Sequence, residues 1–201
     1  MSLRAELESF YAGGTISMRV VAGSAKGRKL YVPKGVDIRP TSDRVKEAIF
    51  NIIGPEVKDK NILDLFAGTG NLAIEALSRG AHRAYLVDSS PRAIDAIQKN
   101  LKVTDLQDKA VVLKADADKA LKRFIKDKQE FDLIFLDPPY RISVSFLDAI
   151  LLTLATGILK HEGLLVLEHS AKDKPKPVEG LEIISTRIYG DTAVTFYRKK
   201  G

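Results

Sequence analysis

From residue 61 onward, apolar residues follow two alternating spacings. Short apolar runs, typical of buried strands, alternate with segments in which apolar residues recur every three or four positions, typical of helices. The predicted strands are 61–66, 83–88, 110–114, 131–137 and 163–169. The predicted helices are 71–80, 91–103, one through Leu121 and Phe124, and 144–155. This alternation predicts an α/β fold of the Rossmann-like kind, a mainly parallel sheet with helices on both faces.

The last predicted elements break this alternation. Residues 181–190 and 192–200 read as two strands joined by a tight turn at Gly190 and Asp191. A hairpin that ends a parallel sheet places one strand antiparallel to its neighbours. We therefore expect about seven strands, one of them antiparallel.

The N-terminal part has a different pattern. Residues 18–33, "MRVVAGSAKGRKLYVP", predict a β-hairpin with a Gly/Ser/Lys turn. Residues 39–55, "RPTSDRVKEAIFNIIGP", predict a helix that begins near Pro40 and ends at Gly54 and Pro55. The apolar face expected for this helix consists of Val45, Ala48, Ile49, Ile52 and Ile53. We interpret residues 1–17 as a leader or cloning remnant and 18–201 as one domain, with an extension (18–55) and a core (61–201).

The composition, 45% hydrophobic and 29% charged residues, is that of a soluble globular protein. No apolar run approaches the ~20 residues of a membrane helix, and the first residues lack the apolar stretch of a signal peptide. The absence of cysteine excludes disulfides and zinc thiolates and fits a reducing cytoplasm. The three histidines, His82, His161 and His169, show no metal-ligand spacing. We expect a cytoplasmic monomer with no metal and no membrane partner.

Positive charge is concentrated near the start of the chain. The whole chain carries a formal charge of +6, and residues 18–46 alone contain eight basic and two acidic residues, which is also +6. Lysines that are scattered along a sequence usually lie on the protein surface in contact with solvent and bind no specific partner. A segment that carries the entire excess beside Gly and Pro favours contact with a polyanion.

The sequence "LDLFAGTGNLA", residues 63–73, lies at the turn from the first core strand into the first core helix. Glycines at 68 and 70 let the backbone approach a ligand, and a helix start offers free N–H groups to it. The same spacing also matches the dinucleotide fingerprint, and a tight turn without a ligand is the structural alternative.

Acidic residues end the next two predicted strands. Asp88 can accept both ribose hydroxyls of an adenosine-containing cofactor, either NAD or S-adenosylmethionine. Asp116 is a plausible acceptor for an adenine amine. For each of them, a helix cap is the structural alternative.

The strand 131–137 ends in "DPPY". An exocyclic amine on a nucleobase is a poor nucleophile because its lone pair is delocalised into the ring. Asp137 and the Pro138 carbonyl can accept its two N–H bonds and make that lone pair usable. The prolines fix the carbonyl in place, and Tyr140 offers a ring on which the base can stack. A proline-rich turn with a capping Asp is the structural alternative.

These motifs resemble those of the class I S-adenosylmethionine-dependent methyltransferases, in which "DLFAGTG" is similar to the cofactor motif and "DPPY" to the motif of the amino-methylating branch. Together with "MRVVAGSAKGRKL" and "RPTSDRVKEAIFNII", they resemble the bacterial RsmD family, over roughly nine-tenths of the chain from Met18 onward. That resemblance implies methyl transfer to guanine N2 in 16S rRNA of the small ribosomal subunit, with S-adenosylmethionine as cofactor.

The resemblance also implies roles for individual residues. The residues expected to hold the target base and to catalyse its methylation are Asp137, Pro138 and Tyr140. Cofactor binding is expected at Asp64, Phe66, Ala67, Gly68, Thr69, Gly70, Asp88, Ser89, Asp116, Ala117 and Asp137. RNA contacts are expected at Arg19, Lys26, Arg28, Lys29, Arg39, Thr41 and Arg44.

Three other functions stay open at this point. An NAD-dependent oxidoreductase would use the same glycines and Asp88. A DNA adenine-N6 or another amino-methyltransferase, such as one acting on protein glutamine, would share "DPPY". A non-catalytic RNA-binding module would keep the fold and the basic segment.

Overall fold

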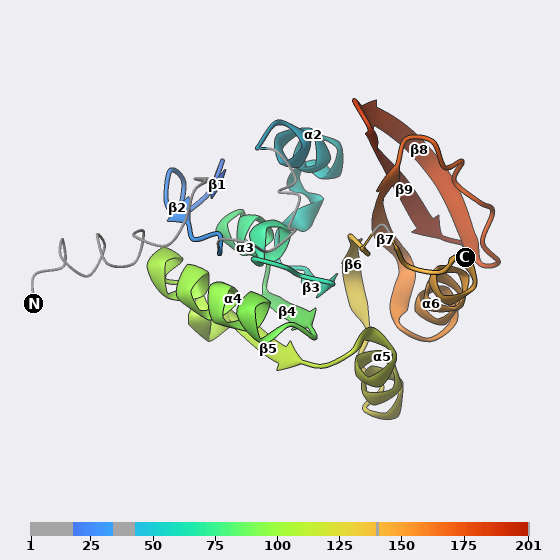
Figure 1. Cartoon of the computed structure of the whole chain (residues 1–201), viewed down its shortest axis with the longest axis horizontal. Coiled ribbons are helices and arrows are strands. Elements are labelled where there is room, and N and C mark those ends of the chain that lie inside the picture. Colours follow the sequence, from blue (N-terminus) through green and yellow to red (C-terminus); the bar gives the residue numbers. More distant parts are fainter. Residues whose placement is uncertain (1–17, 34–42, 140, 201) are drawn as a thin grey trace, which may run out of the picture.

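A sheet of seven strands forms the centre of the protein (Figure 1). The structure is a computed structural model that describes residues 18–33, 43–139 and 141–200. The strands of this sheet are β3 (Asn61–Leu65), β4 (Arg83–Asp88), β5 (Ala110–Lys114), β6 (Phe131–Leu136), β7 (Leu159–Ser170), β8 (Leu181–Tyr189) and β9 (Thr192–Lys199). They lie in the order β5-β4-β3-β6-β7-β9-β8. The five predicted core strands and the C-terminal hairpin are confirmed.

Strand β9 is the antiparallel member of this sheet. It pairs antiparallel with β7 on one side and with β8 on the other, whereas β3 to β7 pair in parallel. The β8–β9 turn at Gly190 and Asp191 inserts β9 between β7 and β8. The expectation of a mainly parallel sheet with one antiparallel strand is therefore confirmed.

Helices cover both faces of the sheet and enclose two apolar cores. The helices are α2 (Asp43–Ile53), α3 (Asn71–Ser78), α4 (Pro91–Thr104), α5 (Ala117–Lys126) and α6 (Val144–Gly157), with short 3-10 turns at Gly54–Val57 and Gln107–Lys109. One core contains side chains of α2, α3 and α4, and the other contains side chains of α5 and α6. Neighbouring strand residues face opposite cores, as Ile62 and Leu63 do.

The strand order reverses direction at β3. From β3 the chain proceeds outward to β4 and β5, and then returns to place β6 on the other side of β3. In open α/β sheets, ligands bind outside the carboxyl ends of the strands at such a reversal. The strand order therefore predicts a ligand site at the ends of β3 and β6, where the glycine turn and Asp137 lie.

The N-terminal hairpin has two short strands, β1 (Met18–Arg19) and β2 (Lys29–Leu30), which pair antiparallel as predicted. Helix α2 is also confirmed within the described residues, but its predicted apolar face is wrong in part. Ile52 is 41% exposed, while Phe50 and Lys46 are buried. The reason is that Phe50 packs on Phe135 of β6, with ring centroids 5.7 Å apart, which sets which side of the helix faces the sheet.

Helix α3 holds the hairpin against the core. The buried Glu75 accepts hydrogen bonds from the amides of Val21 and Ala22, at 2.8 and 3.0 Å. Gly23 lies so close that an added Cβ would be 1.8 Å from the Ser78 carbonyl oxygen, so only glycine fits there. The hairpin is thus fixed by specific backbone contacts to the helix that follows the glycine turn.

None of the helices in the described parts of the chain is long and apolar enough to cross a membrane. The division into a leader at 1–17 and a single domain stays a prediction, and residues 1–17 lie outside the described residues.

Candidate active site

The glycine turn after β3 is held by the end of β4. The amides of Phe66 and Ala67 both donate to the carbonyl of Val87, at 3.1 and 2.9 Å. The Gly68 amide donates to Asp88 Oδ2 at 2.9 Å. Phe66 has φ of +71°, a left-handed value that costs a non-glycine residue of order 1–3 kcal/mol. The turn is therefore a fixed loop whose shape depends on β4.

Gly70 lies against the core as well as in the turn, and its expected role of letting the backbone approach a ligand stays a prediction. It begins helix α3 with φ of +77°, and an added Cβ would be 2.9 Å from Leu86 Cδ2 and 3.4 Å from side-chain atoms of Ile74 and Ile97. A larger residue there would have to adopt this left-handed φ and displace the Leu86 side chain. The glycine thus sets how closely the helix start packs on the sheet.

Asp64 of β3 is hydrogen-bonded to the first turn of helix α3. It is 2% exposed and accepts a hydrogen bond from the Ala73 amide at 3.1 Å. Burial raises the pKa of its carboxyl to about 7; the Ala73 hydrogen bond opposes this shift and the charge of Asp88 adds to it. Removing a carboxylate from water disfavours its charged form, and its pKa therefore rises.

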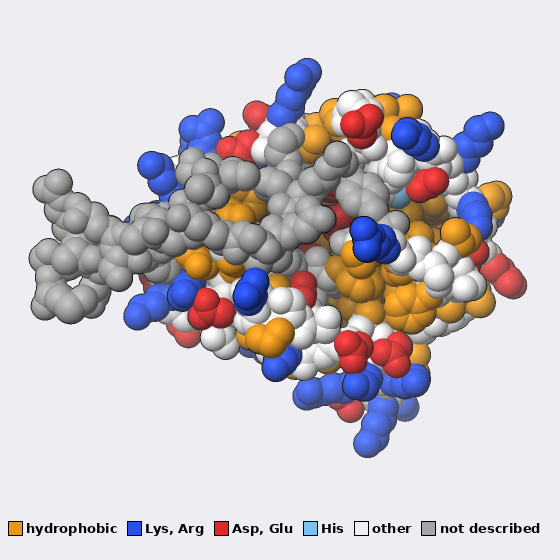
Figure 2. Space-filling model, in the orientation of Figure 1, with side chains coloured by type: hydrophobic (Ala, Val, Ile, Leu, Met, Phe, Trp, Pro, Cys, Tyr) orange, Lys and Arg blue, Asp and Glu red, His pale blue; other side chains and the backbone are white. Residues whose placement is uncertain are grey.

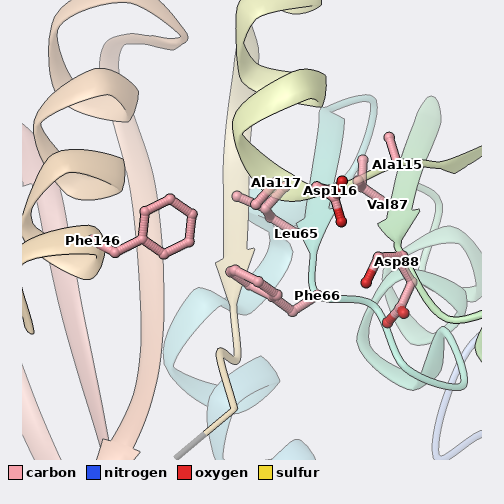
Figure 3. Close-up of a pocket in the computed structure, with 9 residues that line it drawn as sticks. Leu65, Phe66, Val87, Asp88, Ala115, Asp116, Ala117 and Phe146 are labelled. Atoms are coloured by element: carbon pink, nitrogen blue, oxygen red, sulfur yellow. The ribbon is translucent and has the colours of Figure 1, made fainter. Parts of the chain in front are cut away.

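A cavity of about 230 Å³ opens beside this turn (Figure 3). It lies at the ends of β3, β4 and β5, and Phe146 of α6 reaches toward it from the side opposite Asp88 (Figure 3). Its lining residues are Leu65, Phe66, Val87, Asp88, Ser89, Ala115, Asp116, Ala117 and Phe146. Apolar walls with a carboxylate at one end suit a flat base attached to a ribose diol, so the residues fit an adenosine-containing cofactor.

Ten of the eleven predicted cofactor residues divide into two groups around this cavity, and the eleventh, Asp137, lines a separate cavity at the end of β6. Those that line it are Phe66, Asp88, Ser89, Asp116 and Ala117. Those that belong to the turn and the strand beneath it are Asp64, Ala67, Gly68, Thr69 and Gly70. Thr69 is 2% exposed, and its carbonyl accepts from the Asn100 side chain at 3.0 Å. The residues of the second group form the turn and the end of the strand next to the cavity.

The two acids of the cavity differ in how they are held. Asp88 is not a helix cap, because Ser90 caps α4 by accepting from the Ala93 amide; instead the second oxygen of Asp88 accepts from the Ser90 amide at 2.8 Å. Asp116 does occupy the N-cap position of α5, without a side-chain capping bond, and pairs with Lys119 at 3.0 Å. Its side chain is 56% exposed. Asp88 is thus the more rigidly placed acceptor.

A second cavity lies at the ends of β6 and β7. Its walls include Asp137 and Pro138 together with Ile142 and Leu147, and Glu168 of β7 also lines it. The pKa of Asp137 is raised well above its ordinary value, mainly by burial, then by the charge of Glu168, and then by Asp64. Asp137 is therefore a stronger base than a surface carboxylate.

The basic surface is partly as predicted. Lys26, Arg28, Lys29 and Arg44 are exposed, and Arg19 is exposed beside Asp43, with Nε and Oδ2 3.4 Å apart. Lys46, which the sequence analysis counted toward the positive segment, is fully buried and faces Glu75 at 3.5 Å. One positive charge of the segment therefore serves the core and is not available to a polyanion.

Figure 2 shows Lys and Arg side chains around the edge of one face of the molecule, with apolar side chains gathered over α6. Val144 and Phe146 of α6 are 61% and 39% exposed. Among the predicted site residues, Arg39, Thr41 and Tyr140 lie outside the described residues. No cluster of three or more metal-ligating side chains occurs in the part of the chain that the structure describes.

Sequence reasoning did not name several residues that line these cavities, among them Glu168 and Phe146. Glu168 lies near the end of β7, two residues before its last residue, Ser170, and lines the second cavity. A search for acids close to the ends of predicted strands would have found it. Phe146 follows "DPPY" closely, in the first turn of α6, where Ser143 accepts from its amide at 3.3 Å. No local pattern distinguishes Phe146 from an ordinary core residue.

Comparisons with solved structures identify the fold class. The structure of yhhF from Escherichia coli is similar with a TM-score of 0.80 and 28% identity, covering 92% of this chain and 99% of that one. A 16S rRNA N2 methyltransferase (RsmC) of Thermus thermophilus, solved with AdoMet and guanosine, is similar with a TM-score of 0.72 and 23% identity, over 92% of this chain and 50% of that one. The fold and the strand-end site define an S-adenosylmethionine-dependent methyltransferase.

The family model described as Conserved hypothetical protein 95 matches residues 18–198, and this protein belongs to that family. The chain is 44% identical to YlbH of Bacillus subtilis over 187 residues, 92% of this chain and all of YlbH. It is 36% identical to ribosomal RNA small subunit methyltransferase D of Haemophilus influenzae over 159 residues, 79% of this chain and 81% of the relative. The resemblance to the RsmD family is confirmed.

Proposed function

We propose that this protein transfers a methyl group from S-adenosylmethionine to the exocyclic N2 amine of a guanine in 16S rRNA. The observation that carries the proposal is the position of two cavities at neighbouring strand ends. One contains Asp88 beside the glycine turn of β3, and the other contains Asp137 at the end of β6, which pairs directly with β3. The names of the relatives support ribosomal RNA of the small subunit as the substrate.

The cofactor would be held by the residues that the sequence analysis assigned to it. Asp88 would accept hydrogen bonds from the ribose hydroxyls, and Phe66 and Phe146, which line the same cavity, would form apolar walls for the base. We propose that Asp116, which lines the same cavity, accepts a hydrogen bond from the adenine amine. Bound S-adenosylmethionine supplies an already activated methyl group.

The chain's own contribution is to position and activate the amine. Asp137 and the Pro138 carbonyl accept the two N–H bonds of N2, which frees the lone pair for attack. When the nitrogen has gained the methyl group it must lose a proton, and Asp137, with its raised pKa, is a suitable acceptor. We further propose that the target base stacks on the ring of Tyr140. Alignment of the two reactants can supply on the order of 7–11 kcal/mol.

The RNA itself would be held by the exposed basic residues of the hairpin and α2. We propose phosphate contacts from Arg19, Lys26, Arg28, Lys29 and Arg44, with Arg39 and Thr41 bordering the target base. Hydrogen bonds from Val21 and Ala22 to Glu75 fix this surface relative to the glycine turn. We further propose that the protein acts in the cytoplasm as a monomer, on 16S rRNA or on the assembling small subunit.

The direct test is methyl transfer from radiolabelled S-adenosylmethionine to naked 16S rRNA and to small subunits that lack this methylation. We expect a labelled product whose nuclease digest contains N2-methylguanosine by mass spectrometry. N6-methyladenosine in the digest would instead indicate an adenine methyltransferase. RNA binding without transfer would indicate a binding module, and calorimetric binding of NADH in place of S-adenosylmethionine would indicate an oxidoreductase.

A further inference from the structure

Asn100 of helix α4 joins the N-terminal hairpin to the glycine turn. Its Nδ2 donates to the carbonyls of Tyr31 and Thr69, each at 3.0 Å, and its Oδ1 accepts from the Tyr31 amide at 2.6 Å. Tyr31 directly follows β2 of the hairpin, and Thr69 lies between the two glycines of the turn. One side chain therefore sets the distance between these two backbone segments.

The hydrogen-bonding groups of Asn100 match these partners. The side chain is fully buried, where polar groups need partners. Both of its N–H groups donate and its oxygen accepts, so turning the amide over would bring its NH₂ against the Tyr31 amide. Ionised aspartate can only accept hydrogen bonds and leucine makes none, although both are close to asparagine in size. Neither could make the three bonds.

The two segments that Asn100 joins serve different substrates in the proposed reaction. The hairpin carries Lys26 and Arg28, two of the exposed residues proposed to hold the RNA. In the glycine turn, Gly68 precedes Thr69 and donates to Asp88, the proposed ribose acceptor, at 2.9 Å. Methyl transfer requires the amine and the methyl group to be aligned, and a misplacement of about 1 Å can cost about 100-fold in rate. The distance between the two segments therefore matters to the rate.

Two other contacts attach the hairpin to the core. Glu75 of α3 accepts from the amides of residues 21–22, at 2.8 and 3.0 Å. Lys99 of α4 lies over the ring of Tyr31, with Nζ 4.7 Å from the ring centroid. These contacts join the hairpin to the helices, whereas Asn100 also bonds to the glycine turn. We therefore expect that loss of the Asn100 side chain shifts the hairpin relative to the turn and does not detach it.

We propose that Asn100 is a positioning residue for methyl transfer, which holds the RNA-binding hairpin at a fixed distance from the cofactor turn. Because it is fully buried, it acts through these two segments and not by contact with a substrate. This inference rests on the proposed function and adds a residue to it. Its signature is a slower chemical step with nearly unchanged affinity for each substrate alone.

The test uses the full-length variant Asn100→Leu, which nearly keeps the size of the side chain and removes all three hydrogen bonds. Single-turnover kinetics is measured with S-adenosylmethionine and the RNA both at saturating concentration. We expect the chemical rate to fall about 10–100-fold, while the Kd of S-adenosylmethionine and the Kd of the RNA, each measured alone, change less than about threefold.

Thr104→Val is the matched control on the same helix. The Thr104 hydroxyl donates to the carbonyls of Asn100 and Leu101, at 2.7 and 3.1 Å, so the variant removes a buried hydrogen bond within α4 and leaves the Asn100 side chain in place. It should lower the stability to urea but keep the wild-type chemical rate. An equal fall in rate for both variants would mean that any damage to α4 slows the reaction, and would overturn the proposal.

The remaining outcomes separate this inference from the proposed function. If the wild-type protein methylates guanine N2 and Asn100→Leu keeps its rate, or loses rate and cofactor affinity equally, the role of Asn100 is wrong and the proposed function stands. If the wild-type protein transfers no methyl group to any RNA, both are wrong. If Asn100→Leu does not fold, Asn100→Ala, which leaves room for water beside the same backbone groups, is measured in the same way and the same outcomes decide.

Discussion

Asp88 holds the backbone of Gly68: its Oδ2 accepts from the Gly68 amide at 2.9 Å, while its Oδ1 accepts from the Ser90 amide at 2.8 Å. A single carboxylate at the end of β4 thus fixes the turn after β3 and the entry to α4. The same side chain lines the first cavity. The shape of the cofactor loop and the proposed ribose contact therefore depend on one residue.

Asp88→Asn should weaken binding of S-adenosylmethionine by tenfold or more. The amide keeps one acceptor oxygen but brings an NH₂ group toward a backbone N–H, and hydrogen bonds to a charged acceptor are worth about 1.5–3 kcal/mol. Isothermal calorimetry gives the Kd. Asp116→Asn is the control, because that exposed side chain is less tightly placed and should change the Kd less. A larger effect at Asp116 would contradict the ranking of the two acids.

Asp137→Ala should lower the rate of methyl transfer strongly while the S-adenosylmethionine Kd barely changes. The reason is that Asp137 lines the second cavity, at the proposed amine site, and the first cavity contains the cofactor residues. Single-turnover kinetics with saturating cofactor measures the chemical rate, and calorimetry measures the affinity. Comparable losses in both quantities would argue that Asp137 mainly supports the cofactor.

Asp64→Asn should change how stability depends on pH. The carboxyl of Asp64 has a pKa of about 7 in the folded protein against 3.8 ordinarily. Below pH 4 it is protonated in both states; between pH 4 and pH 7 only the folded state keeps the proton, so its contribution to stability falls as pH rises. The loss reaches about 4 kcal/mol at about 1.4 kcal/mol per pH unit and is complete above pH 7.

The asparagine variant is neutral throughout and can still accept from the Ala73 amide. Its free energy of unfolding relative to the wild type should therefore rise between pH 4 and pH 7 and then level off. Urea denaturation at several pH values measures the difference, in which titrating groups that do not interact with Asp64 cancel; Asp88 and Asp137, whose charges interact with it, contribute to the difference. A difference that is constant from pH 4 to pH 8 would show that Asp64 titrates normally.

Lys46→Met should destabilise the protein by about 1–3 kcal/mol, because it removes one of the two cations beside the buried Glu75 and leaves only Arg79, at 2.8 Å. Hydrogen exchange at the amides of Val21 and Ala22, which donate to Glu75, should also become faster. Lys26→Met removes an exposed lysine and serves as the control. Similar stabilities for the two variants would mean that the buried pair contributes little.

The double variant Lys26→Ala with Arg28→Ala should weaken RNA binding and lower its dependence on salt. Each lost phosphate contact reduces the slope of log K against log salt concentration by about 0.7–0.9. Fluorescence anisotropy over a salt series gives the slope. Removing two exposed lysines of α5, Lys122 and Lys126, changes the net charge equally and should leave the slope near its wild-type value.

The sequence by itself determined the local elements and most of the candidate site. Alternating apolar spacings predicted the core strands and helices, because the period of a strand or a helix is written into neighbouring residues. The glycine turn, Asp88 and Asp137 were found because each lies at the end of a predicted strand. In a parallel sheet, these ends meet at one edge whatever the strand order.

Only the tertiary structure decided which side chains meet. Lys46 looked like part of a basic surface, but the packing of α2 buries it against Glu75. Gly70 also packs against Leu86 of β4, a contact that the local sequence does not indicate. Glu168 comes beside Asp137 because β7 pairs with β6, and Phe146 reaches the cofactor cavity from α6. Such contacts depend on strand order and helix packing between segments far apart in the chain, which the local spacing of residues does not encode.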